Sequence, residues 1–231
     1  MLIIFDLDDT LIETSQCLTP FRLERALRKM IALGMQIDSF ERALHFLVEI
    51  NQTASSSHKA LTSFAQLYPG GMQTLELALE TFQEPLPVNL ELALAEGALE
   101  LLEQLSLHHT LALVTIGHRE LQLSKMEKAG LQQGLFSKIT VISPSHEEGG
   151  CSKKPYYEAL LQEFQEEGGA PAPLVCGDRV FVDLTPAKEL GLRTVHIRKG
   201  RGLQQMQPAS DVDFSIQKLE ELKQIIAAVS V

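Results

Sequence analysis

The feature that most restricts the fold is an alternation of short apolar runs and helical stripes between residue 91 and the end of the chain. The runs are rich in apolar residues and only three to five residues long, as short buried strands are. Between them, apolar residues recur at helical spacing. The predicted strands are 110–114, 138–142, 174–176 and 194–197, and the predicted helices are 98–105, 121–129, 157–164, 184–190 and 217–229. This alternation is typical of βαβ units, so the sequence predicts an α/β fold with a doubly wound parallel sheet.

The chain begins with a further apolar run, residues 2–5, which leads directly into three acids, Asp6, Asp8 and Asp9. A short run with no polar alternation predicts a strand that is covered on both faces, as in a parallel sheet. In open parallel sheets, ligands bind at the carboxyl ends of the strands. A solvated strand end is the simpler interpretation, but packing gives no reason to place three acids there. We therefore predict a metal-assisted reaction site.

Residues 14–90 have a different pattern, with helical stripes and no convincing strand. Apolar residues follow i, i+3, i+4 spacing in four segments between residues 19 and 82, so each segment predicts a helix with one apolar face. Four such helices form a small bundle. The predicted organisation is a Rossmann-like core made of residues 1–13 and 91–231, with residues 14–90 inserted as a helical domain.

Composition excludes several classes of function. A formal net charge of −10 argues against nucleic acid and anionic membranes as main partners, because both attract clustered Lys and Arg. The three cysteines, Cys17, Cys151 and Cys176, form no CxxC pair, so neither a zinc site nor a disulfide framework is indicated. Reduced thiols and the lack of a signal-like or membrane-spanning apolar run predict a cytoplasmic protein. The sequence leaves the oligomeric state open.

The residues that follow the other predicted strands suit phosphoryl chemistry. Thr115, Ile116 and Gly117 follow the second strand, and a polar loop at 143–150 leads to a pair of lysines before Pro155. The fourth strand is followed by Gly177 and two acids. Together these positions supply carboxylates for a hard cation, a hydroxyl group and a positive charge.

In these pieces the chain resembles the haloacid dehalogenase (HAD) superfamily of hydrolases. The matching segments are 5–11, 113–117, 154–157 and 175–183, and each lies at a predicted strand end or in the loop that follows it. Because four segments match in the family's order, the resemblance covers essentially the whole chain. It implies that the helical insertion is a C1-type cap, which closes over a small substrate.

The resemblance also implies catalytic roles for the acids. Asp6 would be the nucleophile that forms an aspartyl-phosphate, and Asp8 would be the general acid and base. A Mg²⁺ ion would be held by the Asp6 carboxylate, the Asp8 backbone carbonyl and Asp178. Such an ion reduces the repulsion between an anionic nucleophile and a phosphate group. Asp9 would have a turn or supporting role.

The remaining implied roles concern charge and phosphate. The groups that would bind the phosphoryl oxygens are Thr115, Ile116, Gly117 and Lys154. Lys154 is preferred because it directly precedes Pro155, as in the family pattern, and Lys153 stays open as the alternative. Asp183 would orient the lysine or support the metal ion.

The predicted function is a Mg²⁺-dependent phosphatase that hydrolyses a small phosphorylated metabolite. A phosphomutase or phosphotransferase would use nearly the same residues and stays open, as does a non-catalytic phosphate-binding protein, although such a protein would not need Asp8. A dehalogenase is less compatible, because the position of Asp8 is not acidic in the dehalogenase pattern. The sequence does not identify the substrate.

Overall fold

The computed structural model describes residues 1–144, 151–166, 168, 173–204 and 210–229. Most of the predicted polar loop, residues 145–150, lies outside them. The chain forms two compact units, of which one contains residues 1–13 and 88–231 and the other residues 14–87. Within the described residues, no helix combines the length and the apolar character needed to cross a membrane.

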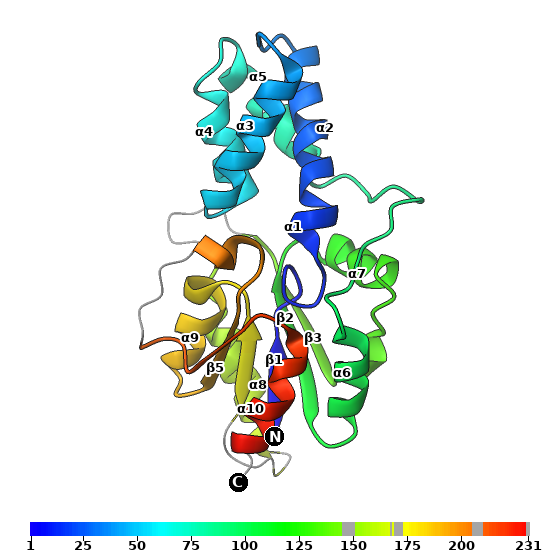
Figure 1. Cartoon of the computed structure of the whole chain (residues 1–231), viewed down its shortest axis with the longest axis vertical. Helices are drawn as coiled ribbons and strands as arrows, with labels where there is room; N and C mark the ends of the chain where they lie inside the picture. The colour runs from blue at the N-terminus through cyan, green and yellow to red at the C-terminus, as the bar shows by residue number, and fades with distance from the viewer. Residues whose placement is uncertain (145–150, 167, 169–172, 205–209, 230–231) are drawn as a thin grey trace. The chain divides into compact units, whose positions relative to one another are not determined.

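The first unit is built on a six-stranded parallel sheet with the order β3-β2-β1-β4-β5-β6 (Figure 1). Its strands are β1 Leu2–Phe5, β2 Thr110–Ile116, β3 Lys138–Ile142, β4 Leu174–Gly177, β5 Arg193–Ile197 and β6 Phe214–Ile216. The predicted α/β fold with a parallel sheet is confirmed. Strand β6 was not predicted, because Ser215 separates its two apolar residues and no apolar run marks it.

Strand β1 lies at the point where the strand order reverses. Ile4 is in register with Ala112 of β2 on one side and with Val175 of β4 on the other. The chain then builds outward in both directions, to β3 and to β6. Ligand sites of doubly wound sheets lie at such switch points. The residues that directly follow β1, β2 and β4 therefore meet at one edge of the sheet.

Helices cover the two faces of this sheet, as the continuous burial of the strands requires. The described helices of the unit are α6 Ala98–Ser106, α7 Arg119–Lys128, α8 Lys154–Glu166, α9 Thr185–Lys188 and α10 Leu222–Val229. On one face, Tyr157 and Leu160 of α8 pack with Leu2, Ile4 and Val114. The predicted helix at 184–190 is preceded by a π-helical turn, Val180–Leu184.

The second unit is helical, with α1 Thr14–Cys17, α2 Thr19–Ala32, α3 Phe40–Thr53, α4 Ser57–Ala65 and α5 Gly71–Glu80. The apolar stripes of α2 to α5 form its core, which includes Leu23, Leu27, Leu47, Leu61 and Phe64. The side chains of Ser39 and Ser56 accept hydrogen bonds from the first turns of α3 and α4, which explains where these two helices begin.

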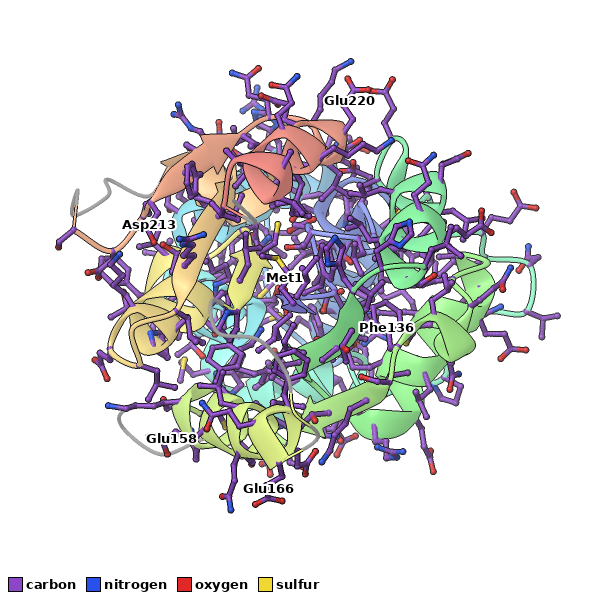
Figure 2. All side chains as sticks on the ribbon, turned by 90° about the horizontal axis from the view of Figure 1, so that it is seen from below. Met1, Phe136, Glu158, Glu166, Asp213 and Glu220 are labelled. Atoms are coloured by element: carbon purple, nitrogen blue, oxygen red, sulfur yellow. The ribbon has the colours of Figure 1, made fainter. Side chains whose placement is uncertain are left out.

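Part of the net negative charge lies on solvated side chains of the sheet unit. Glu158, Glu166 and Glu220 are exposed and point outward from the ribbon (Figure 2). The acids at the strand ends differ, because several of them are buried. Burial of carboxylates costs free energy unless they are paired or bind a cation, so these acids require a specific explanation.

Candidate active site

Asp6 is held at the end of β1 by the backbone. Its N–H group donates to the carbonyl oxygen of Cys176 in β4 at 3.0 Å. The chain then turns tightly, and the N–H groups of Leu11 and Ile12 both donate to the carbonyl oxygen of Leu7. Asp9 has a φ of 55°, a left-handed conformation that Asp tolerates better than most residues. Asp9 thus has the turn role that the sequence predicted for it.

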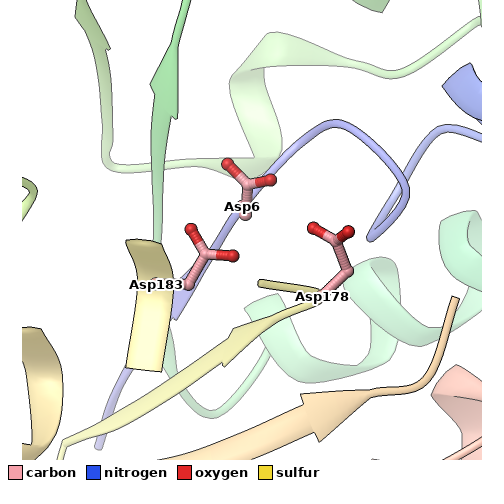
Figure 3. A group of neighbouring side chains, drawn as sticks. All are labelled: Asp6, Asp178 and Asp183. Atoms are coloured by element: carbon pink, nitrogen blue, oxygen red, sulfur yellow. The ribbon is translucent and has the colours of Figure 1, made fainter. Parts of the chain in front are cut away.

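Three buried carboxylates meet at the switch point (Figure 3). Oxygens of Asp6, Asp178 and Asp183 lie within 4.8 Å of one another. Burial raises the pKa of Asp6 from its ordinary 3.8 to about 7; Lys153 opposes this shift, and the neighbouring acids add to it. Burial, with repulsion from Asp183 and Asp6, likewise raises the pKa of Asp178 well above its usual range. The cluster therefore disfavours its own negative charge.

Lys153 supplies the compensating positive charge. Its ammonium group donates hydrogen bonds to Asp6 Oδ1 at 2.6 Å and to the carbonyl oxygen of Val114 at 2.7 Å, and it forms an ion pair with Asp183 Oδ1 at 2.6 Å. The side chain is 1% exposed. Burial acts to lower the pKa of Lys153, but the attraction of Asp183 and Asp6 outweighs it and raises that pKa. Lys153 thus remains an ammonium ion.

The prediction that Lys154 lies at the site does not match this geometry. Its ammonium group binds Glu189 at 2.8 Å on the surface, and its side chain is 37% exposed. The two lysines separate because Lys153, the residue directly before α8, lies one helical turn before the buried Tyr157, whose N–H group donates to its carbonyl oxygen. Extending the apolar stripe of α8 back by one turn would have selected Lys153.

Asp8 turns away from the buried cluster and toward α7. Its two carboxylate oxygens lie 2.7 and 2.8 Å from the ammonium group of Lys125. The side-chain amide of Gln122 donates to Asp8 Oδ2 at 3.0 Å and to Thr115 Oγ1 at 2.6 Å. Neither Gln122 nor Lys125 was predicted from the sequence. Helix faces were assigned from the spacing of apolar residues, and this spacing does not reveal a buried polar residue such as Gln122.

The residues at the end of β2, with Gly117 after it, are only partly in the predicted arrangement. Thr115 is buried, and because its hydroxyl oxygen accepts from Gln122, its own hydrogen is available for another acceptor. Ile116 is half-buried beside it. The N–H group of Gly117 donates to the carbonyl oxygen of Ile142 at 2.9 Å, so it is committed to β3. The N–H group of Gly117 is therefore not placed to bind a phosphoryl oxygen.

Two glycines instead make room for site residues. A Cβ atom at Gly117 would lie 2.8 Å from the side chain of Gln122, and one at Gly177 would lie 2.6 Å from the side chain of Asp183. Real Cβ atoms do not approach other atoms so closely. Any larger residue would displace Gln122 from Asp8, or Asp183 from Lys153.

The cluster fits a small divalent cation. It offers carboxylate oxygens, which are the ligands that Mg²⁺ prefers. Asp178 Oδ1 is buried and accepts no hydrogen bond from any described group, and an unpaired buried carboxylate oxygen is costly. The backbone of Asp178 is fixed, since its carbonyl oxygen is 2.8 Å from His196 Nε2. A cation beside Asp6 and Asp178 would satisfy the unpaired oxygen and relieve the mutual repulsion.

Comparison with known proteins identifies the family of the chain. Residues 3–197 match the family model of the haloacid dehalogenase-like hydrolases. The chain is 30% identical to the glyceraldehyde 3-phosphate phosphatase of Methanocaldococcus jannaschii, with 97% of this chain and 96% of the relative covered. It is 28% identical to the enzyme of the same name from Methanopyrus kandleri, over 97% and 96% of the two chains.

Solved structures share the fold. A HAD phosphatase from Thermococcus onnurineus is 22% identical with a TM-score of 0.59, and 97% of each chain is covered. A HAD-family protein from Bacillus subtilis, solved bound to magnesium, is 20% identical with a TM-score of 0.61 and 98% coverage of each chain. The matched segment includes Asp6, Thr115, Lys153 and Asp178. The chain therefore belongs to the haloacid dehalogenase-like hydrolases, and it is an enzyme of the phosphatase branch of that superfamily.

Proposed function

We propose that the protein is a Mg²⁺-dependent phosphatase that hydrolyses a small phosphomonoester through an aspartyl-phosphate on Asp6. The observation that carries this proposal is the buried cluster of Asp6, Asp178 and Asp183, with Lys153 in contact with two of its members. A structural ion pair would need one carboxylate for one lysine. Three carboxylates around one ammonium group leave net negative charge, which favours a divalent cation.

In the first step, Asp6 attacks phosphorus and the ester P–O bond breaks. Lys153 holds Asp6 Oδ1, so the carboxylate is oriented, and its positive charge opposes the rise in the pKa of Asp6 that burial causes. Asp8 donates a proton to the leaving oxygen, which departs as an alcohol. The Thr115 hydroxyl and the main chain at Ile116 bind phosphoryl oxygens, and Lys153 stabilises the charge that develops on them.

In the second step, water attacks the phosphorus atom of the aspartyl-phosphate. Asp8, now a carboxylate, takes a proton from that water, and the bond between phosphorus and Asp6 breaks. Inorganic phosphate leaves and Asp6 is regenerated. Asp183 contributes through Lys153, because it binds the ammonium group at 2.6 Å and accepts from the N–H group of Arg179 at 2.9 Å.

The residues that would hold Mg²⁺ are the carboxylates of Asp6 and Asp178 and the backbone carbonyl of Asp8. When bound, the ion offsets the negative charge shared by the nucleophile and the phosphate group. It would also lower the raised pKa values of Asp6 and Asp178 by direct attraction. Both carboxylates would then be ionised at neutral pH.

The proposed substrate is a short phosphorylated metabolite. Glyceraldehyde 3-phosphate is the first candidate, because two relatives that match over 97% of this chain are named glyceraldehyde 3-phosphate phosphatase. We propose that the helical unit acts as a cap that excludes water and selects the substrate. We also propose a cytoplasmic location, where phosphorylated metabolites occur and free cysteines stay reduced.

A panel of phosphomonoesters tests the function. With Mg²⁺ present, we expect phosphate release from glyceraldehyde 3-phosphate or another short sugar phosphate, with kcat/KM of about 10⁴ M⁻¹ s⁻¹ or above. Chelation should stop the reaction, and excess Mg²⁺ should restore it. If no ester is hydrolysed, the proposed activity is wrong. If hydrolysis continues at full rate in the chelator, the metal assignment is wrong.

A second prediction concerns stability and pH. The pKa of Asp6 is higher in the folded protein, about 7, than its ordinary 3.8. The folded state therefore binds this proton more tightly than the unfolded chain does, so the stability from this group is full at low pH and is lost as pH rises through about 7. Mg²⁺ competes with that proton and should stabilise the protein more at about pH 8 than at about pH 6.

The measurement is the melting temperature with and without Mg²⁺ at both pH values. At about 100 times Kd the stabilisation is about 2.7 kcal/mol, a rise of roughly 5–10 °C for a chain of this size. Asp178→Asn removes a proposed ligand and should reduce the rise, whereas the same change at the exposed Asp38 should not. An equal rise at both pH values would contradict the competition between metal and proton.

A further inference from the structure

Lys125 is a largely buried lysine whose side chain points toward the proposed active site. It lies on α7, a helix whose buried residues are Gln122 and Met126 and which packs near β3. Its side chain is only 11% exposed, yet its partner Asp8 is 29% exposed. A lysine at this position would normally extend into water. Here it bends toward the end of β1 and contacts both oxygens of Asp8, at 2.7 and 2.8 Å.

Gln122 extends the same contact to the phosphate-binding side of the site. It lies one turn before Lys125 on α7, so the two side chains leave the helix on the same face. Its amide donates to Asp8 Oδ2 at 3.0 Å and to Thr115 Oγ1 at 2.6 Å. The fold makes space for this amide, because Gly117 lacks the Cβ atom that would collide with it.

The two lysines of the site therefore have separate partners. Lys153 contacts Asp6 and Asp183, whereas Lys125 contacts Asp8. Lys125 is not needed to hold the nucleophile. Its two contacts instead fix the carboxyl group of Asp8, which in its protonated form must deliver a proton to the leaving oxygen. A displacement of about 1 Å at such a group can lower the rate about 10²-fold.

We propose that Lys125, supported by Gln122, is a positioning residue that holds the carboxyl group of Asp8 for proton transfer to the leaving group. The inference rests on the proposed function, in which Asp8 gives its proton to the ester oxygen while the P–O bond breaks and the bond from Asp6 to phosphorus forms. Lys125 acts through Asp8 and touches neither the phosphorus nor the leaving oxygen.

The dependence of the rate on the leaving group tests this role. An alkyl phosphate needs protonation of its leaving oxygen, whereas p-nitrophenolate departs without it. Lys125→Met should lower kcat/KM for an alkyl phosphate about 10²-fold and for p-nitrophenyl phosphate less than about 5-fold. The ratio kcat/KM is the correct readout, because it reports only the steps up to departure of the leaving group. A merely structural role would lower both values alike.

Matched variants complete the test. Lys125→Arg can contact both oxygens of Asp8 and should restore most of the activity with the alkyl phosphate. Lys128 lies one turn further along α7 and contacts the carbonyl oxygen of Val88. Lys128→Met should leave kcat/KM for both esters unchanged. If Lys125→Met does not fold, as judged by circular dichroism, Lys125→Gln keeps a polar group at the position and is interpreted in the same way.

Two outcomes distinguish the inference from the function on which it rests. An active wild-type enzyme in which Lys125→Met loses activity equally on both esters, or loses none, overturns the positioning role and leaves the phosphatase in place. A wild-type protein that hydrolyses neither ester in the presence of Mg²⁺ overturns the proposed function and this inference together.

Discussion

Asp6→Asn should abolish turnover while leaving the fold intact. The amide oxygen is a poor nucleophile toward phosphorus, so we expect kcat/KM to fall by at least about 10³-fold on every substrate. Asn has nearly the same shape, and Lys153 keeps its contacts with Asp183 and with the carbonyl oxygen of Val114. The measurements are phosphate release and the melting temperature, made on the same protein sample.

The expected change in the melting temperature of Asp6→Asn distinguishes a catalytic role of Asp6 from a role in folding. Because burial raises the pKa of Asp6 to about 7, its ionised carboxylate destabilises the metal-free protein above that pH. Asp6→Asn removes this charge, so its melting temperature at about pH 8 without Mg²⁺ should equal or exceed that of the wild type. A large decrease in melting temperature would mean that Asp6 supports the fold, and loss of activity could then not be assigned to the nucleophile.

A covalent trap and a control variant make the result specific. Tritiated borohydride reduces an acyl phosphate to the alcohol with release of phosphate, so treatment during turnover should label position 6 in the wild type and give no label in Asp6→Asn. The same substitution at the exposed Asp38 should change neither activity nor labelling. Near-normal activity in Asp6→Asn, or a label at another acid, would remove Asp6 as the nucleophile.

The sequence predicted the sheet and its reactive edge because both depend on local patterns. Continuous apolar runs identify strands that are covered on two faces, and the acids after β1 and β4 interrupt those runs abruptly. A parallel sheet then brings the ends of β1, β2 and β4 together without any further information. Asp6, Thr115 and Asp178 could therefore be placed together from the sequence.

The parts that sequence analysis missed depend on the direction in which a side chain leaves a helix. Successive helical residues differ by about 100° around the axis, so neighbouring lysines at 153 and 154 point to different surroundings. Gln122 and Lys125 lie on a helix with little apolar pattern, where nothing in the sequence distinguishes a residue that faces the site from one that is solvated. Only the folded chain shows that their side chains meet Asp8.

Substitutions at the two adjacent lysines should have opposite outcomes. Lys153→Met removes the ammonium group that contacts Asp6 and Asp183, and we expect kcat to fall about 10²-fold to 10³-fold because charge on the transferred phosphoryl group is no longer stabilised. It also leaves buried carboxylates without their partner, which costs about 3–5 kcal/mol and should lower the melting temperature. Lys154→Met changes a surface contact with Glu189 and should leave kcat, KM and melting temperature unchanged.

The comparison is sharp because the same chemical change is made one residue apart. Lys153→Arg adds a control, because it keeps the positive charge but places a larger, planar group among three oxygens that surround a compact ammonium ion. We therefore expect the melting temperature to recover more than kcat does. The reverse pattern, with Lys154→Met inactive and Lys153→Met active, would assign catalysis to the exposed lysine. It would also show that the buried contact between Lys153 and Asp6 serves the fold alone, because a charge required by the reaction cannot be removed without loss of rate.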